Sequence, residues 1–392
     1  MYSAGTIDRT LAAAVEDSRV PGVVAMATDG KETIYEGAFG VRQLGGSQPM
    51  TADTVFWIAS MTKAVTGACL MQLVEQGRIG LDDDCGRFVP ALASPHVLDG
   101  FDAKGAPRLR PAHGAITLRR LLTHTAGFVY DTWNRDMLRY MQVTGISRAT
   151  SFVRPDDCQP LAFDPGTRWE YGINIDWAGK VLEAITGQSL DAYMQEHLLQ
   201  PLGMRSTGYL LRAEISARLA GMHQRAVDGR LAAVAYDPPQ RTADFLGGGG
   251  LYSTAGDYLR FLLMMLNGGA LDGVRVLRPE TVATMGENHI GQTDVAAMRS
   301  ARPEMSADAD FFPGQRVKWG LSFLINTEDV PGRRAAGSLA WAGLRNTYYW
   351  IDPKRRIAGT IMTQILPFAD PTVLALYERY ERGVYEVAAR PA

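Results

Sequence analysis

A hydroxyl and an amine stand three residues apart in the stretch Phe56-Trp57-Ile58-Ala59-Ser60-Met61-Thr62-Lys63-Ala64-Val65-Thr66-Gly67-Ala68-Cys69-Leu70. Three residues is almost one turn of a helix, so Ser60 and Lys63 project from the same face. Apolar residues continue at helical spacing beyond this stretch, and Gly77 suits the end of a helix. A serine beside an amine in the first turn of a helix can be a nucleophile with its base.

A purely structural interpretation of the same residues stays open. Ser60 can cap the helix while Lys63 reaches the surface along its aliphatic stem. A free lysine amine titrates near about 10.4, so a basic role for Lys63 requires burial or a neighbouring cation. The chain contains 34 arginines and only six lysines, and an arginine could not become neutral to serve as a base.

Composition limits the classes of function. The chain has 392 residues, of which 46% are hydrophobic, enough for one large domain or two joined ones. Its 40 basic and 42 acidic residues give a net charge of −2 without long like-charge runs, so we expect a small-molecule ligand and neither nucleic acid nor a membrane surface as partner.

The N-terminal residues lack a secretion signal, and no apolar run is long enough to cross a membrane, so we expect a cytoplasmic protein. Cys69, Cys85 and Cys158 show no metal-ligand spacing. We therefore expect reduced thiols, no metal and no cofactor. The oligomeric state cannot be predicted.

The two ends of the chain contain the strand patterns. We expect a helix over Thr6–Asp17, and then a β-hairpin with its turn at Asp29-Gly30. Near the other end, four strand-like runs precede a last helix from Asp370 to Val387: Lys318–Ile325, Gly337–Ala342, Asn346–Ile351 and Ile357–Gln364.

The middle of the chain is predicted to be mostly helical. Its helices are expected at Leu118–Leu122, Asp136–Val143, Ile175–Thr186 and Asp191–Leu199. Four glycines, Gly247 to Gly250, then favour close backbone packing, and a helix runs from Ser253 through Met265. Residues Glu287 to Gln315 are polar with little periodicity, which indicates a long, mobile surface insertion.

This order predicts an α/β (α+β) fold in two parts. Residues 1–80 and 245–392 would pair into one antiparallel sheet flanked by helices, and residues 81–244 would form a mainly helical domain inserted between them. Ser60 lies where the chain leaves the sheet region. We therefore expect it in the cleft between the two parts, a preferred position for a ligand.

A tyrosine in a polar turn could assist the serine and the lysine. Tyr171 occupies such a turn just before a predicted helix, although it could also be a packed aromatic residue. His124 lies in a turn rich in threonine and glycine, for which a structural role is favoured.

Several motifs occur together in the order seen in one superfamily. They are Ser60-Met61-Thr62-Lys63, Leu121 to Phe128, Tyr171 before its helix, Pro201 to Met204, Gly247 to Leu251, Leu266 to Gly269, and Trp341-Ala342-Gly343. In combination the chain resembles the serine β-lactamase and penicillin-binding-protein superfamily. It is most similar to the family VIII carboxylesterases, which have the class C β-lactamase fold.

The resemblance implies roles for individual residues. Ser60 would be the acylated nucleophile, Lys63 its general base and Tyr171 a proton shuttle to the departing alcohol. The backbone N–H groups of Ser60 and Leu344 would form the oxyanion hole, because Trp341-Ala342-Gly343 stands where β-lactamases have Lys-Thr-Gly. Further residues expected to contact a small-molecule ester substrate are Trp341, Gly343, Trp57, Phe128, Tyr130 and Trp133.

Two departures from the superfamily pattern favour esters as substrates. Trp341 replaces a lysine that would hold the carboxylate of a β-lactam. Ile173 stands where β-lactamases usually have asparagine, with Asn174 one place later. We therefore predict a carboxylesterase acting on short-chain esters. The alternatives are a β-lactamase or peptidoglycan peptidase, an acyltransferase, and a non-catalytic penicillin-binding module.

Overall fold

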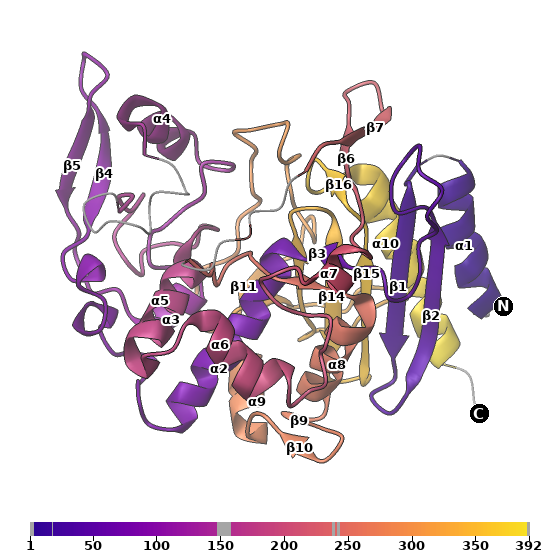
Figure 1. Cartoon of the computed structure of the whole chain (residues 1–392). Helices are drawn as coiled ribbons and strands as arrows, with labels where there is room; N and C mark the ends of the chain where they lie inside the picture. The colour runs from indigo at the N-terminus through magenta and orange to yellow at the C-terminus, as the bar shows by residue number, and fades with distance from the viewer. Residues whose placement is uncertain (1–3, 18, 147–157, 237–239, 241–243, 390–392) are drawn as a thin grey trace.

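A seven-stranded antiparallel sheet lies at the centre of the computed structural model, which describes residues 4–17, 19–146, 158–236, 240 and 244–389. The strand order is β11-β12-β13-β14-β15-β1-β2 (Figure 1). Its strands are β1 (Gly22–Thr28), β2 (Thr33–Gly40), β11 (Val317–Trp319), β12 (Leu324–Asn326), β13 (Leu339–Gly343), β14 (Thr347–Asp352) and β15 (Ile357–Met362).

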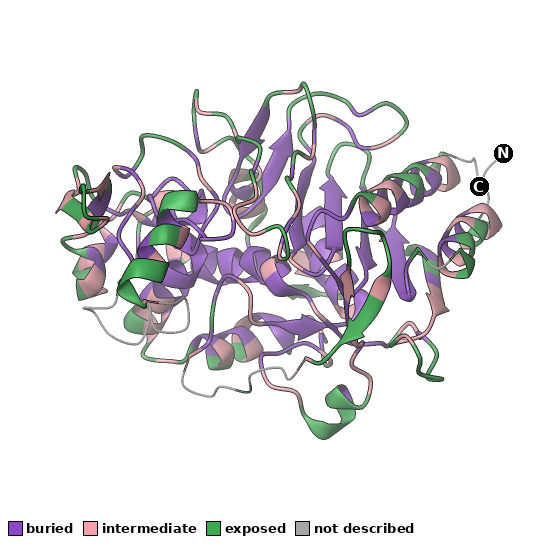
Figure 2. Cartoon of the chain, turned by 90° about the horizontal axis from the view of Figure 1, so that it is seen from above, coloured by how far each residue is buried: buried purple, intermediate pink, exposed green. Residues whose placement is uncertain are grey.

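The two ends of the chain meet within this sheet. Strand β1 pairs with β15, with Val24 opposite Met362 and Thr28 opposite Ala358. Every residue of β1, β13, β14 and β15 is buried, because both faces of the sheet are covered (Figure 2). The predicted pairing of the two ends into one sheet is confirmed.

Helices cover both faces of the sheet. Helices α1 (Ala4–Glu16) and α10 (Pro371–Ala388) pack together near the two termini, and α8 (Ala255–Leu266) lies on the opposite side of the sheet (Figure 1). The start of α10 is fixed by Asp370, whose carboxylate accepts the backbone N–H groups of Thr372 and Val373.

Helix α2 (Thr62–Glu75) runs through the interior directly after a 3₁₀ turn at Ala59–Met61. Every residue from Thr62 to Leu73 is buried, so α2 is enclosed nearly all round rather than on one face. It packs against α5 (Asn174–Thr186) and α6 (Leu190–Met194). The structure thus places the segment that follows Ser60 in the core of the molecule.

The middle of the chain contains the predicted helices but also strands that the sequence did not indicate. Strands β4 (His96–Phe101) and β5 (Pro107–Pro111) form a hairpin. Strands β6 (Met222–Arg225) and β7 (Leu231–Val234) form a small sheet with β16 (Ile365–Leu366). The boundaries of the two proposed domains therefore remain a prediction.

The remaining elements are short. The helices and turns are α3 (Leu118–Leu122), α4 (Arg135–Thr144), a π-helical turn (Gln195–Leu199), α7 (Ala213–Ser216), α9 (Pro279–Met285) and 3₁₀ turns at Cys85–Arg87 and Pro90–Leu92. The strands pair as β3 (Phe56–Trp57) with β8 (Tyr252–Ser253) and β9 (Ala270–Leu271) with β10 (Val274–Arg275).

One expectation near the end of the chain is wrong. The strand-like run Lys318–Ile325 is not one strand but parts of β11 and β12, joined by a tight turn in which Ser322 has a φ of 76°. Residues 287–315 contain no helix or strand and are mostly exposed or half-buried, as predicted, but Met298 and Phe312 are buried and the N–H of Ala301 donates to the carbonyl of Thr132. This segment is held against the loop that carries Tyr130 and Trp133.

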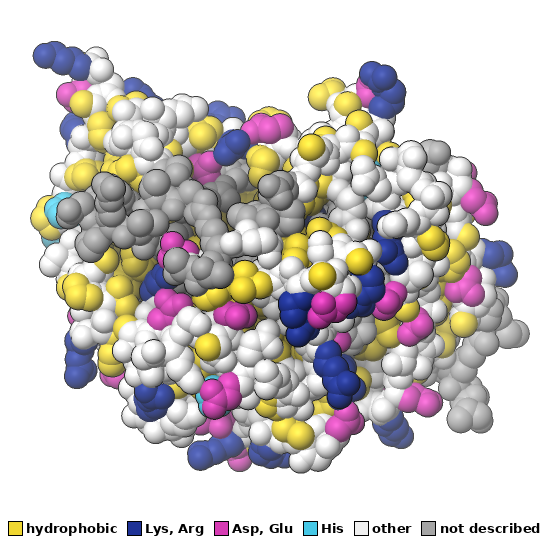
Figure 3. Space-filling model, in the orientation of Figure 1, with side chains coloured by type: hydrophobic (Ala, Val, Ile, Leu, Met, Phe, Trp, Pro, Cys, Tyr) yellow, Lys and Arg dark blue, Asp and Glu magenta, His cyan; other side chains and the backbone are white. Residues whose placement is uncertain are grey.

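The surface agrees with the small net charge. On the face drawn in Figure 3, basic and acidic side chains are interspersed. Among the residues that the structure describes, no helix combines the length and the apolar character that a membrane span requires.

Candidate active site

The backbone is strained immediately before Ser60. Ala59 has a φ of 44°, in the left-handed region that residues with a Cβ rarely adopt, and it is buried. Such a conformation costs on the order of 1–3 kcal/mol, and strain of this kind clusters at functional sites. Ser60 follows Ala59 in the 3₁₀ turn that leads directly into α2.

Lys63 is fully buried and makes three polar contacts through its amine. Nζ lies 3.2 Å from Ser60 Oγ, 3.1 Å from the hydroxyl of Tyr130 and 2.6 Å from the backbone carbonyl of Gly248. Within the described part of the chain, Lys63 forms no ion pair with a carboxylate. The contact with Ser60 is the one that the spacing of the two residues predicts, and the surface position considered for Lys63 is excluded.

Ser60 lies on the wall of a cavity of about 350 Å³. The size is within the range of small-molecule sites, roughly 300–1,000 Å³. Most of the lining is apolar or aromatic. Its residues are Trp57, Ala59, Ser60, Tyr130, Thr132, Trp133, Ile173, Asp176, Tyr209, Tyr236, Asp244, Phe245, Leu246, Gly248, Gly249, Gly250, Tyr252 and Leu344.

Four of the residues predicted for the site therefore share the cavity with Ser60: Trp57, Tyr130, Trp133 and Leu344. Trp57 is held in place by its neighbours. Its indole N–H donates to the carbonyl of Gly249 at 2.8 Å, and its ring stacks on Tyr236 at 5.3 Å. The buried guanidinium of Arg345 lies 4.8 Å from the centre of the Trp57 ring.

Gly343 brings the end of strand β13 against the segment that precedes Ser60. A Cβ at this position would lie 2.3 Å from the carbonyl oxygen of Ile58 and 2.2 Å from Thr347 Oγ1, so only glycine fits. The next residue, Leu344, lines the cavity together with Ser60. This arrangement is compatible with the predicted oxyanion hole, which stays a prediction.

Tyr171 lies next to Lys63 but outside the cavity lining. The centre of its ring is 4.8 Å from Lys63 Nζ, and its hydroxyl accepts a hydrogen bond of 3.0 Å from the indole N–H of Trp341. Both side chains are buried. Trp341 packs edge-on against Trp319 with ring centres 4.7 Å apart. The Trp341 indole thus holds the Tyr171 hydroxyl by a hydrogen bond from strand β13.

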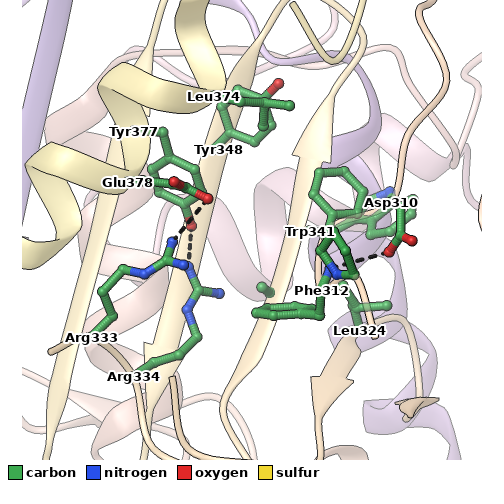
Figure 4. A pocket seen from close by; sticks show the side chains of 13 residues that line it. Asp310, Phe312, Leu324, Arg333, Arg334, Trp341, Tyr348, Leu374, Tyr377 and Glu378 are labelled. Carbon is green, nitrogen blue, oxygen red and sulfur yellow. Dashed lines mark hydrogen bonds and ion pairs between the residues drawn. The ribbon is translucent and has the colours of Figure 1, made fainter. Parts of the chain in front are cut away.

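Trp341 also borders a second, smaller cavity of about 120 Å³. Figure 4 shows this cavity between Trp341 and Phe312 on one side and Tyr377 of α10 on the other. Arg334 closes it through hydrogen bonds to Tyr377 and Glu381. None of its lining residues belongs to the lining of the cavity at Ser60.

Phe128 and His124 lie in the core behind Tyr171. Phe128 stacks on Trp177 and does not line the cavity. The side-chain N–H₂ group of Asn174 donates to the Phe128 carbonyl at 2.8 Å and lies 3.0 Å from His124 Nδ1. Burial and the charge of Lys63 hold the pKa of His124 well below its usual value. His124 is therefore a neutral core residue, in agreement with the structural role that the sequence favoured.

Three features of the site were not predicted from the sequence. Tyr130 was expected to contact substrate, but not to hydrogen-bond to Lys63, and neither Asp176 nor the Gly248 carbonyl had a predicted role. Asp176 lies in the first turn of α5, where its Oδ1 accepts the N–H of Gly248 at 2.8 Å. No local spacing links these residues, because 72 positions separate Asp176 from Gly248.

Comparisons with known proteins agree with this geometry. The sequence profile of the family described as Beta-lactamase matches residues 7–381. Monacolin J acid methylbutanoyltransferase from Aspergillus terreus is 33% identical, over 95% of this chain and 93% of that protein. Lovastatin esterase from Penicillium rubens is 31% identical, over 97% of this chain and 98% of that protein.

A solved structure matches over nearly the whole chain. It is a variant of simvastatin synthase from Aspergillus terreus, with a TM-score of 0.86 and 32% identity, and the match covers 98% of this chain and 94% of that one.

Proposed function

The chain belongs to the Beta-lactamase family, as a serine hydrolase or acyltransferase with the β-lactamase fold, and on that premise we propose that it hydrolyses carboxylic esters with short acyl groups through an acyl-enzyme at Ser60. In this proposal Lys63 is the general base and Tyr171 carries a proton to the departing alcohol. Trp57, Tyr130 and Trp133 contact the substrate from the cavity wall.

One observation carries the proposal: the 3.2 Å hydrogen bond between Lys63 Nζ and Ser60 Oγ at the wall of a large, mainly apolar cavity. The amine is buried and forms no ion pair with a carboxylate in the described part of the chain. A serine within hydrogen-bond reach of such an amine has the arrangement of an activated nucleophile.

The first half of the reaction forms the acyl-enzyme. Neutral Lys63 accepts the proton of Ser60 as Oγ attacks the ester carbonyl carbon, and the carbonyl oxygen becomes an oxyanion. The N–H groups of Ser60 and Leu344 donate to this oxygen, and one such donor is worth roughly 2.7–4 kcal/mol of transition-state stabilisation. The C–O bond to the alcohol then breaks, and Tyr171 supplies the proton to the leaving oxygen while it regains one from Lys63.

The second half of the reaction returns the free enzyme. Lys63 accepts a proton from a water molecule as this water attacks the acyl carbon. The bond to Ser60 Oγ breaks, Oγ takes up the proton, and the carboxylic acid leaves. The apolar lining of the cavity supports uncharged esters as substrates, because a buried charge without a partner is costly.

Acyl transfer to an alcohol is the second candidate function. The observation that favours it is the name of one relative, a methylbutanoyltransferase. The chemistry differs in one step, in which an alcohol instead of water attacks the acyl-enzyme. The volume of about 350 Å³ offers room for a bulky alcohol beside the acyl group.

The test combines turnover with detection of the adduct. The purified protein is assayed with nitrophenyl esters of increasing acyl length and with a chromogenic cephalosporin, each with and without an added acceptor alcohol. We expect the short esters to be hydrolysed fastest and Ser60→Ala to lose this activity while it keeps its melting temperature. Mass spectrometry of the quenched reaction should show a transient acyl group on the peptide with Ser60.

Other results would select the alternatives. Faster hydrolysis of the cephalosporin would favour a β-lactamase or peptidase, and a new ester in the presence of the alcohol would favour an acyltransferase. A stable adduct without turnover would favour a penicillin-binding module. Undiminished turnover by Ser60→Ala would place the active site elsewhere.

A further inference from the structure

The amine of Lys63 is held by acceptors from two distant parts of the chain. One is the backbone carbonyl of Gly248, at 2.6 Å, and the other is the hydroxyl of Tyr130, at 3.1 Å. Ser60 Oγ is the third contact, at 3.2 Å. Ser60, Tyr130 and Gly248 all line the same cavity.

Asp176 contacts both of the groups that hold the amine. Its Oδ1 accepts the backbone N–H of Gly248 at 2.8 Å, and its Oδ2 accepts a longer hydrogen bond of 3.5 Å from the hydroxyl of Tyr130. The side chain is 4% exposed. A Cβ at Gly248 would lie 2.5 Å from Asp176 Oδ2, so glycine is required for the loop to approach the carboxylate this closely.

Three oxygens surround Lys63 Nζ, and the amine can form a hydrogen bond with each of them in its charged and in its neutral form. A charged ammonium has three N–H donors, one for each of the three neighbouring oxygens. A neutral amine has two N–H donors and one lone pair. If the two donors point to Gly248 and Tyr130, the lone pair faces Ser60 Oγ, which is the direction in which a base must accept the serine proton.

This orientation requires Tyr130 to accept from Lys63 and to donate its own proton elsewhere. Asp176 is an acceptor for that proton, and it also fixes the peptide unit whose carbonyl receives the second N–H of Lys63. A carboxylate cannot donate a hydrogen bond, so it leaves no ambiguity in the direction of these bonds.

We propose that Asp176 is a positioning residue that acts through Tyr130 and Gly248 to aim the lone pair of Lys63 at Ser60. The inference rests on the proposed function, in which Lys63 is the base. It adds a defined task for a residue that touches neither Ser60 nor Lys63 through a hydrogen bond in the described structure.

Asp176→Asn tests the direction of the hydrogen bonds with almost no change in shape. The amide oxygen can still accept the N–H of Gly248, but the N–H₂ group then faces Tyr130 as a donor. The Tyr130 proton can then turn toward the lone pair of Lys63, whose Nζ lies 3.1 Å from the Tyr130 hydroxyl. We expect kcat on a short-chain ester to fall by about tenfold or more, a part of the 10²–10⁴ that a general base contributes.

Asp257→Asn is the matched control. Asp257 is also the third residue of a helix, α8, and its carboxylate accepts a backbone N–H from Ser206 and a hydroxyl from Thr207. It has no contact with the cavity. We expect this variant to keep the kcat of the parent, although its melting temperature falls with the loss of a half-buried, hydrogen-bonded carboxylate.

The pH dependence separates positioning from a simple charge effect. A positioning role predicts that Asp176→Asn lowers kcat at every pH, including the alkaline plateau, with KM changed less than about threefold. If the kcat of Asp176→Asn on the alkaline plateau equals that of the parent, the inference is overturned. This holds whether or not the acid side of the kcat profile shifts in pH. If Asp176→Asn does not fold, Tyr130→Phe removes the same acceptor and predicts the same loss at the plateau.

The same experiment distinguishes failure of the inference from failure of the proposed function. The acyl adduct on Ser60 is followed by mass spectrometry in parent and variants. An adduct that forms at the parent's rate in Asp176→Asn and in Tyr130→Phe overturns the positioning role alone. Absence of an adduct on Ser60 in the parent itself overturns the proposed function.

Discussion

The amine of Lys63 donates a 2.6 Å hydrogen bond to the backbone carbonyl of Gly248, a residue 185 positions further along the chain. The contact depends on the glycines of the loop, because a Cβ at Gly247 would lie 2.5 Å from the carbonyl of Ile175. The close backbone packing that the four consecutive glycines predict is therefore confirmed. This packing connects Lys63 on α2 to the first turn of α5.

Tyr171→Phe tests the proposed proton shuttle. The change keeps the ring against Lys63 but removes the hydroxyl, so we expect kcat on a short-chain ester to fall about 10²-fold. It also leaves the buried N–H of Trp341 without its acceptor, at a cost of about 1–3 kcal/mol in the free energy of unfolding.

A second buried pair of the same type provides the control for Tyr171→Phe. The indole N–H of Trp350 donates to the hydroxyl of Tyr385 at 3.2 Å, and neither residue lines the cavity at Ser60. Tyr385→Phe should lower the melting temperature without loss of kcat. If Tyr171→Phe also keeps its kcat, the hydroxyl supports Trp341 and carries no proton.

Gly343→Ala tests how closely strand β13 must approach the segment before Ser60. The added Cβ would overlap the carbonyl of Ile58, and overpacking of this kind typically costs about 1–3 kcal/mol. The strand end that carries Leu344 must then move away from Ser60. We expect at least about a tenfold loss of kcat/KM, since one oxyanion donor is worth 10²–10³ in rate.

Gly256→Ala serves as the comparison for Gly343→Ala. A Cβ at Gly256, in the first turn of α8, would meet its nearest neighbour, Met26, only at 3.8 Å. The variant should keep full activity with an equal or slightly higher melting temperature. Parent-like kcat/KM in Gly343→Ala would show that the approach of β13 is not needed for catalysis.

The burial of a neutral His124 predicts that the folded protein loses stability in mild acid. Its pKa is held well below the usual value of about 6.5 by burial and by the charge of Lys63. As the pH falls below about 6.5, the unfolded chain binds a proton that the folded chain cannot accept. The stability that neutral His124 contributes is therefore present above this pH and is lost progressively below it.

The measurement compares melting temperatures near pH 7.5 and near pH 5 for the parent and for His124→Asn. Asparagine tolerates the φ of 58° at this position and offers an oxygen in place of Nδ1. We expect the variant to lose less of its melting temperature on acidification. His223 and His289, whose pKa values are also lowered, retain a part of the dependence in both proteins. An equal loss in both would assign the effect to other groups.

Local patterns in the sequence predicted the elements whose formation depends on residues that are close together in the chain. The spacing of Ser60 and Lys63, the apolar continuation of α2 and the strands of the central sheet could be identified in this way. The pairing of β6 with β16 could not, because both strands are short and lie far apart in the chain, with His223 opposite Ile365.

The residues of the candidate site likewise divide into those that the sequence predicted and those that only the folded structure brings together. Trp57 and Leu344 were predicted from their nearness in sequence to recognisable motifs, and both line the cavity. Asp176 and Tyr130 meet only in the folded protein, 46 positions apart, so no periodicity or motif connects them. The lack of periodicity in residues 287–315 predicted an irregular surface segment, but not the single buried side chains, such as Phe312, that anchor it.

Lys63→Arg tests the central claim, that a neutral amine at this position accepts the proton of Ser60. Arginine keeps the positive charge and helix propensity but cannot become neutral near pH 7. Lys318→Arg is the control, because Lys318 is also a buried lysine and donates to two backbone carbonyls, those of Gly291 and Thr293. Lys63→Met, of similar length and without charge, serves if Lys63→Arg does not fold.

The direct measurement is kcat on a short-chain nitrophenyl ester for the parent, Lys63→Arg and Lys318→Arg, with the melting temperature of each. The account predicts that Lys63→Arg melts within a few degrees of Lys318→Arg and loses about 10²–10⁴ in kcat, whereas Lys318→Arg keeps the activity of the parent. A folded Lys63→Arg protein that retains more than about a tenth of the parent kcat would contradict the assignment of Lys63 as the base.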